Sequence, residues 1–175
     1  AERAGVVIKH VRESGHLCAV DKHANDPVTR ADFAAQTLIF GSLRRRWPAL
    51  CLVGEEDEAR CGGPDAAALV ELAEKARLRS SDPAELARCT VAVPAALKQL
   101  PAAELCVYID PLDATREYTR GSTEPVMVLI GVTHNNAPLL GVTHQPFVEP
   151  DRGGRTLAAL VQRRRASAVS STAAA

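Results

Sequence analysis

The sequence lacks an excess of charge of either sign, which limits the partners it can attract. Its 175 residues contain 21 Lys plus Arg and 21 Asp plus Glu, so the formal net charge is zero. This balance gives no global electrostatic reason to bind a nucleic acid. A membrane helix needs roughly 20 apolar residues in a row, and the longest obvious apolar run covers only residues 126–132. We therefore expect neither a nucleic-acid partner nor a membrane span.

The cysteines and histidines lack the spacing of a zinc site or of a disulfide framework. There are five of each, and the cysteines stand far apart, mostly among apolar neighbours. An odd number of separated thiols is typical of reduced cysteines in a cytosolic protein. We therefore predict a cytoplasmic location.

The chain does contain a pair of carboxylates three residues apart that follows an apolar stretch. Residues 105–109 resemble a strand, and Asp110 and Asp113 come next, in the run Y-I-D-P-L-D-A-T-R-E-Y-T. Pro111 lacks an N–H and favours an extended Asp110, so we expect the strand to end there with both acids at its carboxyl end. Leu112 would offer a carbonyl, and oxygen ligands suit Mg²⁺ before Zn²⁺. The alternative is an Asp-Pro turn in which the second acid caps a helix.

Two further segments carry acidic residues in a similar context. Residues 50–53 are typical of a buried strand and end in G-E-E-D-E, which places Glu55 at a second strand terminus. Upstream, N-D-P-V-T-R-A-D precedes a stretch at 31–47 whose apolar residues recur at helical spacing. Thr29 and Asp32 match a capping box, with Asp in place of the usual Glu or Gln, and this reading is as well supported here as a catalytic one.

The motifs D-P-V-T-x-A-D, G-E-E-D and D-P-L-D-A-T-x-E-Y-T, followed by apolar stretches at 126–133 and 139–145, together resemble the inositol monophosphatase superfamily of lithium-sensitive, magnesium-dependent phosphatases. The E-Y-T run, the ending G-V-T-H-Q-P-F and the long insert after G-E-E-D are most similar to its 3′(2′),5′-bisphosphate nucleotidases. The resemblance implies an α+β, layered sugar-phosphatase fold whose first domain has a largely antiparallel sheet flanked by helices. The two apolar stretches should pair as an antiparallel hairpin.

The resemblance also implies Mg²⁺-dependent hydrolysis of a small phosphate ester, either adenosine 3′,5′-bisphosphate or an inositol phosphate. In the family, the first Glu of G-E-E, both aspartates of D-P-L-D and the carbonyl between them bind metal, which carries over to Glu55, Asp110, Leu112 and Asp113. Divalent ions can activate water, neutralise the phosphoryl group and stabilise the departing alkoxide. The alternatives are an inositol polyphosphate 1-phosphatase and a domain that binds phosphate or metal without catalysis.

Thr115 and Asp32 are implied to orient the attacking water together, because the matching Thr and Asp are paired in the family. Thr115 could instead cap a short helix at 116–120, which is compatible with catalysis because helix-terminal N–H groups also bind phosphate. The amides of Ala114 and Thr115 are then the expected phosphate ligands. Most members have Gly in place of Ala114, and the Ala form is similar to that of the Golgi-resident adenosine bisphosphate phosphatases. A Gly is usually kept where φ is positive or where a ligand approaches the backbone.

The expected organisation is a metal-dependent phosphatase N-terminal domain over residues 1–150. A helical insert at 62–102 should face solvent, with a lid as the alternative. Residues 151–175 are expected to be disordered, because a basic run is followed by Ser, Thr and Ala without periodicity. The only Trp is Trp47, so the W-D-x-x-A motif of the family's second domain is absent. We therefore expect a truncated chain that hydrolyses its substrate poorly.

Overall fold

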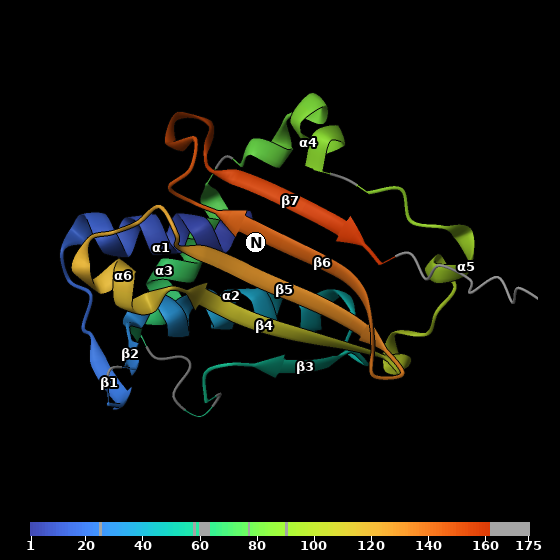
Figure 1. Cartoon of the computed structure of the whole chain (residues 1–175), viewed down its shortest axis with the longest axis horizontal. Helices are drawn as coiled ribbons and strands as arrows, with labels where there is room; N and C mark the ends of the chain where they lie inside the picture. Colours follow the sequence, from blue (N-terminus) through green and yellow to red (C-terminus); the bar gives the residue numbers. More distant parts are fainter. Residues whose placement is uncertain (25, 58, 60–63, 77, 90, 162–175) are drawn as a thin grey trace, which may run out of the picture.

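A mixed sheet backed by helices forms the body of the protein. The structure is a computed structural model that describes residues 1–161 apart from 25, 58, 60–63, 77 and 90. Within these residues one sheet has the strand order β3-β4-β5-β6-β7, and β1 and β2 form a separate antiparallel pair (Figure 1). The strands are β1 (Val20–His23), β2 (Asp26–Val28), β3 (Cys51–Gly54), β4 (Leu105–Asp113), β5 (Met127–His134), β6 (Ala137–Gln145) and β7 (Arg155–Leu160).

Helices cover one face of the large sheet (Figure 1). α1 and α2 pack on each other and on the sheet, and α3 packs against both. Apolar residues from these helices and from β4 and β5 form a single buried core. The helices are α1 (Glu2–Ser14), α2 (Arg30–Arg46), α3 (Pro64–Lys75), α4 (Pro83–Cys89), α5 (Ala95–Lys98) and α6 (Thr115–Arg120), with 3₁₀ turns at Arg79–Ser81, Ala102–Glu104 and Pro150–Arg152.

The large sheet is antiparallel except at one edge. β3 runs parallel to β4, and every other pairing in the sheet is antiparallel. β5 and β6 form the expected hairpin, with Asn135 and Asn136 at φ 50° and 60° in the turn. A two-residue loop with both φ values positive matches the twist of the strands, and Asn tolerates that conformation. The expectation of a largely antiparallel sheet flanked by helices is confirmed.

β4 is longer than the sequence predicts. The strand was expected to end before Asp110, but it continues to Asp113. Its pairing with β5 shifts register between Asp110 and Asp113, and β3 ends opposite Ile109. Pro111 therefore lies at a bulge, where the ladder needs no N–H from it.

The predicted disorder of residues 151–175 is wrong for its first part. β7 pairs antiparallel with β6 from Arg155 to Leu160 and forms the far edge of the sheet. Burial alternates along β7, yet Leu157 points outward and is 56% exposed. Apolar residues on both faces hide the period of two that identifies a strand. Residues 162–175 lie outside the described part of the chain, so that part of the expectation stays a prediction.

The insert at 62–102 is helical but does not simply face solvent. On α3, Ala66, Leu69 and Ala73 are buried in the main core. Further along, the carboxylate of Glu2 accepts hydrogen bonds from the backbone N–H of Ser80 at 3.0 Å and from its hydroxyl at 2.7 Å. The insert is therefore fastened to α1, and the solvent-facing expectation is wrong for α3. Over the described ranges, no helix combines the length and apolar character needed to cross a bilayer.

Candidate active site

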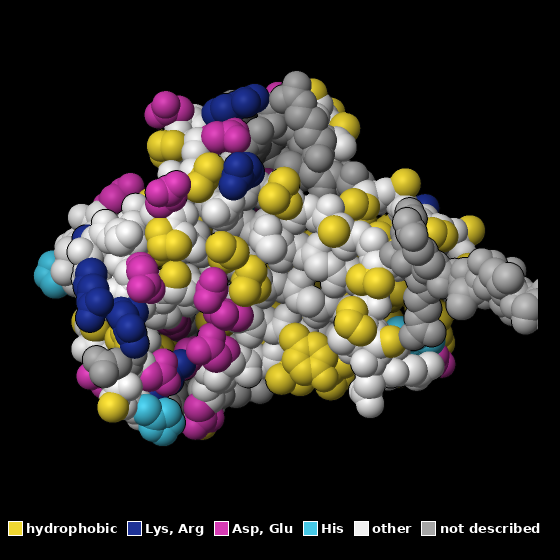
Figure 2. Space-filling view, in the orientation of Figure 1, with side chains coloured by type: hydrophobic (Ala, Val, Ile, Leu, Met, Phe, Trp, Pro, Cys, Tyr) yellow, Lys and Arg dark blue, Asp and Glu magenta, His cyan; other side chains and the backbone are white. Residues whose placement is uncertain are grey.

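One pocket gathers the residues that the motifs single out. It has a volume of about 310 Å³ and lies where β3 and β4 end. Figure 2 shows acidic side chains gathered at that end of the molecule. The pocket is lined by all of the predicted metal and phosphate ligands: Glu55, Asp110, Leu112, Asp113, Ala114 and Thr115.

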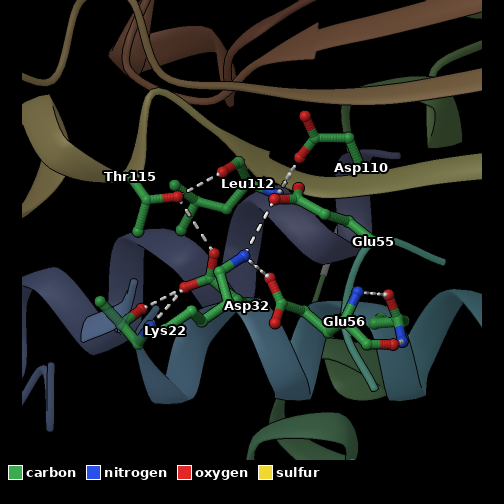
Figure 3. Close-up of polar contacts among 9 residues, drawn as sticks. Lys22, Asp32, Glu55, Glu56, Asp110, Leu112 and Thr115 are labelled. Atoms are coloured by element: carbon green, nitrogen blue, oxygen red, sulfur yellow. Dashed lines mark hydrogen bonds and ion pairs between the residues drawn. The ribbon is translucent and has the colours of Figure 1, made fainter. Parts of the chain in front are cut away.

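The parallel pairing of β3 with β4 brings the two acidic clusters together. Gly54, the last residue of β3, pairs with Ile109, so the residue that follows β3 lies beside Asp110 on β4. The N–H of Glu55 then donates to the carbonyl of Ile109 at 3.0 Å, which extends the ladder by one step. Glu55 and Asp110 therefore project side by side (Figure 3).

The acids in this pocket repel one another. Burial raises the pKa of Asp110 to about 7, helped by its contact with Glu55 and by the charge of Asp113. The N–H of Leu112 donates to Asp110 Oδ1 at 3.2 Å and opposes the shift only in part. Carboxylates that repel one another and retain a proton bind a cation favourably, because the cation neutralises their charge in place of the proton.

Lys22 supplies a positive charge that sequence reasoning missed. From β1, its Nζ lies 3.0 Å from Glu55 Oε1 and 2.9 Å from Glu56 Oε1 (Figure 3). Burial alone would lower the pKa of Lys22, but its contacts with Glu56 and Glu55 raise it well above the usual value. No pattern in the segment V-D-K-H distinguishes this Lys from an ordinary charged hairpin residue.

Gln36 on α2 holds the turn that carries both glutamates. Its Nε2 donates to the carbonyl of Glu56 at 2.8 Å, and its Oε1 accepts from the N–H of the same residue at 3.0 Å. Gln36 is 1% exposed. In the sequence, Gln36 stands among the apolar residues of the stretch that forms α2. The motif analysis did not use this signal.

Gly54→Ala should therefore destabilise the protein by about 2–4 kcal/mol. A Cβ at Gly54 would lie 2.2 Å from Gln36 Oε1 and 2.4 Å from its Cδ, so the amide would lose both buried hydrogen bonds. Gly131→Ala, on β5 of the same sheet, is the matched control, because a Cβ there meets nothing within 4 Å. Urea denaturation of both variants tests this, and equal stabilities would contradict it.

Asp32 supports the start of a helix and also contacts Thr115, which lines the pocket. Its Oδ2 accepts from the N–H of Thr29 at 2.8 Å and from its hydroxyl at 2.6 Å, which completes a capping box at the start of α2. Its Oδ1 accepts from the Thr115 hydroxyl at 3.2 Å (Figure 3). The carboxylate that completes the capping box of α2 is therefore also the one that contacts Thr115. Burial raises the pKa of Asp32 to about 7, although the hydrogen bonds from Thr29 oppose this shift.

Thr115 is held in place by the contacts of its own hydroxyl and by the anchoring of α6. Its hydroxyl also lies 2.8 Å from the carbonyl of Leu112, the shorter of its two contacts. Tyr118 anchors the helix, since it is fully buried and its hydroxyl donates to the carbonyl of Ile8 at 2.8 Å. The N-cap of α6 is Ala114, so the alternative in which Thr115 caps the helix is wrong.

Ala114 has the left-handed conformation that the resemblance led us to suspect, with φ 66° and ψ 40°. A Cβ costs roughly 1–2 kcal/mol in this region, whereas Gly adopts it freely. We expect Ala114→Gly to stabilise the protein by about 1 kcal/mol. Ala67→Gly, at an exposed position of α3, should instead destabilise by a similar amount. Thermal unfolding shows whether each variant is more or less stable than the unsubstituted chain. Destabilisation by Ala114→Gly would contradict the proposed backbone strain at Ala114.

The oxygen atoms of the pocket suit a hard divalent cation. Glu55, Asp110 and Asp113 offer carboxylates and Leu112 a carbonyl, the ligand types of Mg²⁺ and Ca²⁺. Among the residues that the structure describes, no three His, Cys, Asp or Glu side chains are already arranged closely enough to hold an ion. Since Lys22 engages Glu55, that carboxylate would have to exchange the ammonium group for the metal.

Without metal, stability should fall as the pH rises from about 4 to 7. Asp32 and Asp110 have folded-state pKa values of about 7, above the unfolded value near 4. The folded chain therefore holds more protons than the unfolded chain across this window, and a rise in pH favours unfolding. The contribution of Asp32 lowers the free energy of unfolding by at most about 1.4 kcal/mol per pH unit. The contribution of half-buried Asp110 is smaller.

Urea denaturation in EDTA between about pH 4.5 and 7.5 measures this slope. Asp32→Asn should remove the larger part of it, while Asp151→Asn, at an exposed position, should leave it unchanged. A flat or rising curve in EDTA would show that these acids are not destabilised by burial.

Comparison with known proteins identifies the family of the chain. The model of the inositol monophosphatase family matches residues 1–170. The 3'(2'),5'-bisphosphate nucleotidase 1 of Dictyostelium discoideum is 38% identical over 156 residues, which cover 89% of this chain and 47% of the relative. The Homo sapiens protein of that name is 34% identical over 167 residues, covering 90% and 49%. The Golgi-resident adenosine 3',5'-bisphosphate 3'-phosphatase of Mus musculus is 32% identical over 85% of this chain and 39% of its own.

Solved structures show the same fold. The extragenic suppressor protein suhB from Bartonella henselae has a TM-score of 0.59 at 20% identity, over 91% of this chain and 45% of its own. An IMPase/NADP phosphatase solved with NADP and Ca²⁺ has a TM-score of 0.54 at 13% identity, over 89% and 43%.

The chain spans about half the length, or less, of the curated relatives that it matches. Within that span the match is nearly continuous, since the family model covers residues 1–170. The resemblance inferred from the motifs is thereby confirmed, and the chain belongs to the inositol monophosphatase family.

Proposed function

We propose that this chain carries the metal-binding and water-activating residues of a phosphomonoesterase acting on adenosine 3′,5′-bisphosphate. The observation that carries the proposal is the convergence of Glu55, Asp110, Leu112 and Asp113 with Thr115 on one pocket. The names of the relatives support the substrate, because both curated groups compared above act on bisphosphorylated nucleotides. The odd number of cysteines and their wide separation in the sequence support the proposed cytoplasmic location.

The proposed metal is Mg²⁺, held by the carboxylates of Glu55, Asp110 and Asp113 and by the carbonyl of Leu112. When bound, such an ion supplies charge neutralisation and lowers the pKa of a water molecule. The chain's own contribution is to fix the ligands: Gln36 holds the Glu55–Glu56 turn through its two hydrogen bonds. Ala114 and Thr115 would present their backbone amides to the phosphate at the start of α6.

Thr115 and Asp32 are proposed to hold and move the proton of the attacking water. The Thr115 hydroxyl lies between the carbonyl of Leu112 and Asp32 Oδ1. It can therefore accept from a water while donating to Asp32. Since the pKa of Asp32 is about 7, this carboxylate can take up a proton near neutral pH, as a general base should.

A phosphate-release panel tests this function. The chain is incubated with adenosine 3′,5′-bisphosphate, AMP and inositol phosphates, with Mg²⁺ or with EDTA, and binding is measured in parallel. We expect slow Mg²⁺-dependent release, as for a chain that hydrolyses its substrate poorly, and we expect it to be fastest with the bisphosphate. Mg²⁺-dependent binding without release would favour the non-catalytic alternative, and preference for an inositol phosphate would favour the inositol polyphosphate 1-phosphatase. Neither binding nor release would refute the proposal.

A further inference from the structure

A pair of thiols lies across the parallel edge of the sheet, away from the acidic pocket. Cys51 on β3 and Cys106 on β4 are direct Cα partners in the register. Their Sγ atoms are 2.9 Å apart, although the residues are 55 positions apart in the chain. Neighbouring strands lie about 4.8 Å apart, which falls within the Cα separations that a disulfide spans. The pair can therefore be linked without moving the backbone.

Small oxidants can reach this pair. Along β3 and β4 both cysteines alternate with the residues that pack into the core, so their side chains lie on the opposite face of the sheet. Cys51 is exposed and Cys106 half-buried. The next outward positions on the same two strands, Val53 and Tyr108, are 41% and 47% exposed. Among the described cysteines, this is the pair whose thiols are in contact.

The strand that the link would hold is short and leads to the proposed metal site. β3 has four residues and, among the described strands, pairs with β4 alone at the edge of the sheet. Glu55 follows it directly, and Asp110 lies four residues after Cys106. A covalent bond between the two strands would therefore restrain the segment that positions both acids.

We propose that Cys51 and Cys106 form a dithiol site that is reversibly oxidised to a disulfide by a low-molecular-weight disulfide such as oxidised glutathione. One Cys thiolate attacks the oxidant to form a mixed disulfide and releases one glutathione. The second thiolate then attacks the mixed disulfide, forms the Cys51–Cys106 bond and releases the other glutathione. Two electrons pass to the oxidant, and the two protein thiol protons end on the two glutathione thiols. Exposed disulfides are the readily reduced ones, so the step is reversible by excess reduced glutathione.

The test is titration of the purified chain with mixtures of oxidised and reduced glutathione, followed by intact mass and peptide mapping. We expect the mass to fall by two hydrogens, with the link mapped to Cys51 and Cys106 and reversed by reductant. Cys51→Ser and Cys106→Ser should each abolish it, and Cys18→Ser, which removes another exposed thiol, should retain it. The oxidised chain should melt at a temperature about 5 °C or more higher, with slower amide exchange in β3.

Two results would overturn the proposal. In one, both thiols become glutathione adducts that do not resolve to an intramolecular bond. In the other, both stay unmodified under conditions that modify Cys18. Because mass, mapping and melting need neither Mg²⁺ nor substrate, their outcome is independent of the phosphatase proposal.

Discussion

Asp113→Asn should lower the affinity for Mg²⁺ on the order of a hundredfold. The substitution removes one of the three carboxylates, Glu55, Asp110 and Asp113, that we propose as metal ligands in the pocket, and charge count largely sets the affinity of such sites. In the absence of metal the same variant should be slightly more stable, because the repulsion that raises the pKa of Asp110 is reduced. Removal of the Asp113 charge causes both changes: it weakens Mg²⁺ binding and it raises the stability of the metal-free chain.

Calorimetric titration with Mg²⁺ and thermal unfolding in EDTA measure the two effects. Asp151→Asn removes the same charge from an exposed turn far along the chain and should change neither quantity beyond error. An unchanged Mg²⁺ affinity in Asp113→Asn would exclude this residue as a ligand. A loss of stability in EDTA would show that Asp113 has a structural role instead.

Thr115→Ala and Asp32→Asn should each reduce the turnover number roughly 10²–10⁴-fold, the range typical of a lost general base. KM should change little, because neither side chain is proposed to hold the substrate. Their contact of 3.2 Å makes them one unit, so the double variant should be little worse than either single variant. The measurement is Mg²⁺-dependent phosphate release from adenosine 3′,5′-bisphosphate.

The control for this pair is Thr119→Ala, on the same short helix. Its hydroxyl donates to the carbonyl of Arg116 within the helix, so turnover should stay within about twofold. Because Asp32 also caps α2, unfolding of Asp32→Asn must be measured alongside, and a loss of about 1 kcal/mol is expected. Fully additive losses in turnover would contradict the joint action of Thr115 and Asp32.

The sequence predicted the local parts of this site well. Glu55 directly after β3, Asp113 at the end of β4 and the cap at Thr29 all depend on neighbours in the chain. The cap has a local physical cause, a side-chain oxygen near free amides. Such causes can be recognised without knowing the fold.

The remaining features depend on which segments meet. Lys22 reaches Glu55 and Glu56 across more than 30 positions of sequence, and nothing near Lys22 indicates that contact. The same holds for the Cys51–Cys106 pair, which exists only because β3 and β4 align in parallel. β7 was missed because its apolar residues lie on both faces, and the bulge at Pro111 because strand length was inferred from Pro alone.

The most direct test of the central claim is a crystal of the chain soaked with Mn²⁺ in place of Mg²⁺, with the ion located by anomalous scattering. We predict a peak in the pocket within about 2.0–2.3 Å of the Leu112 carbonyl and of carboxylate oxygens from Asp110 and Asp113. Glu55 should have turned from Lys22 toward the ion. An ordered Mn²⁺ bound only elsewhere, or a pocket without a peak in which Lys22 still contacts Glu55, would contradict the account.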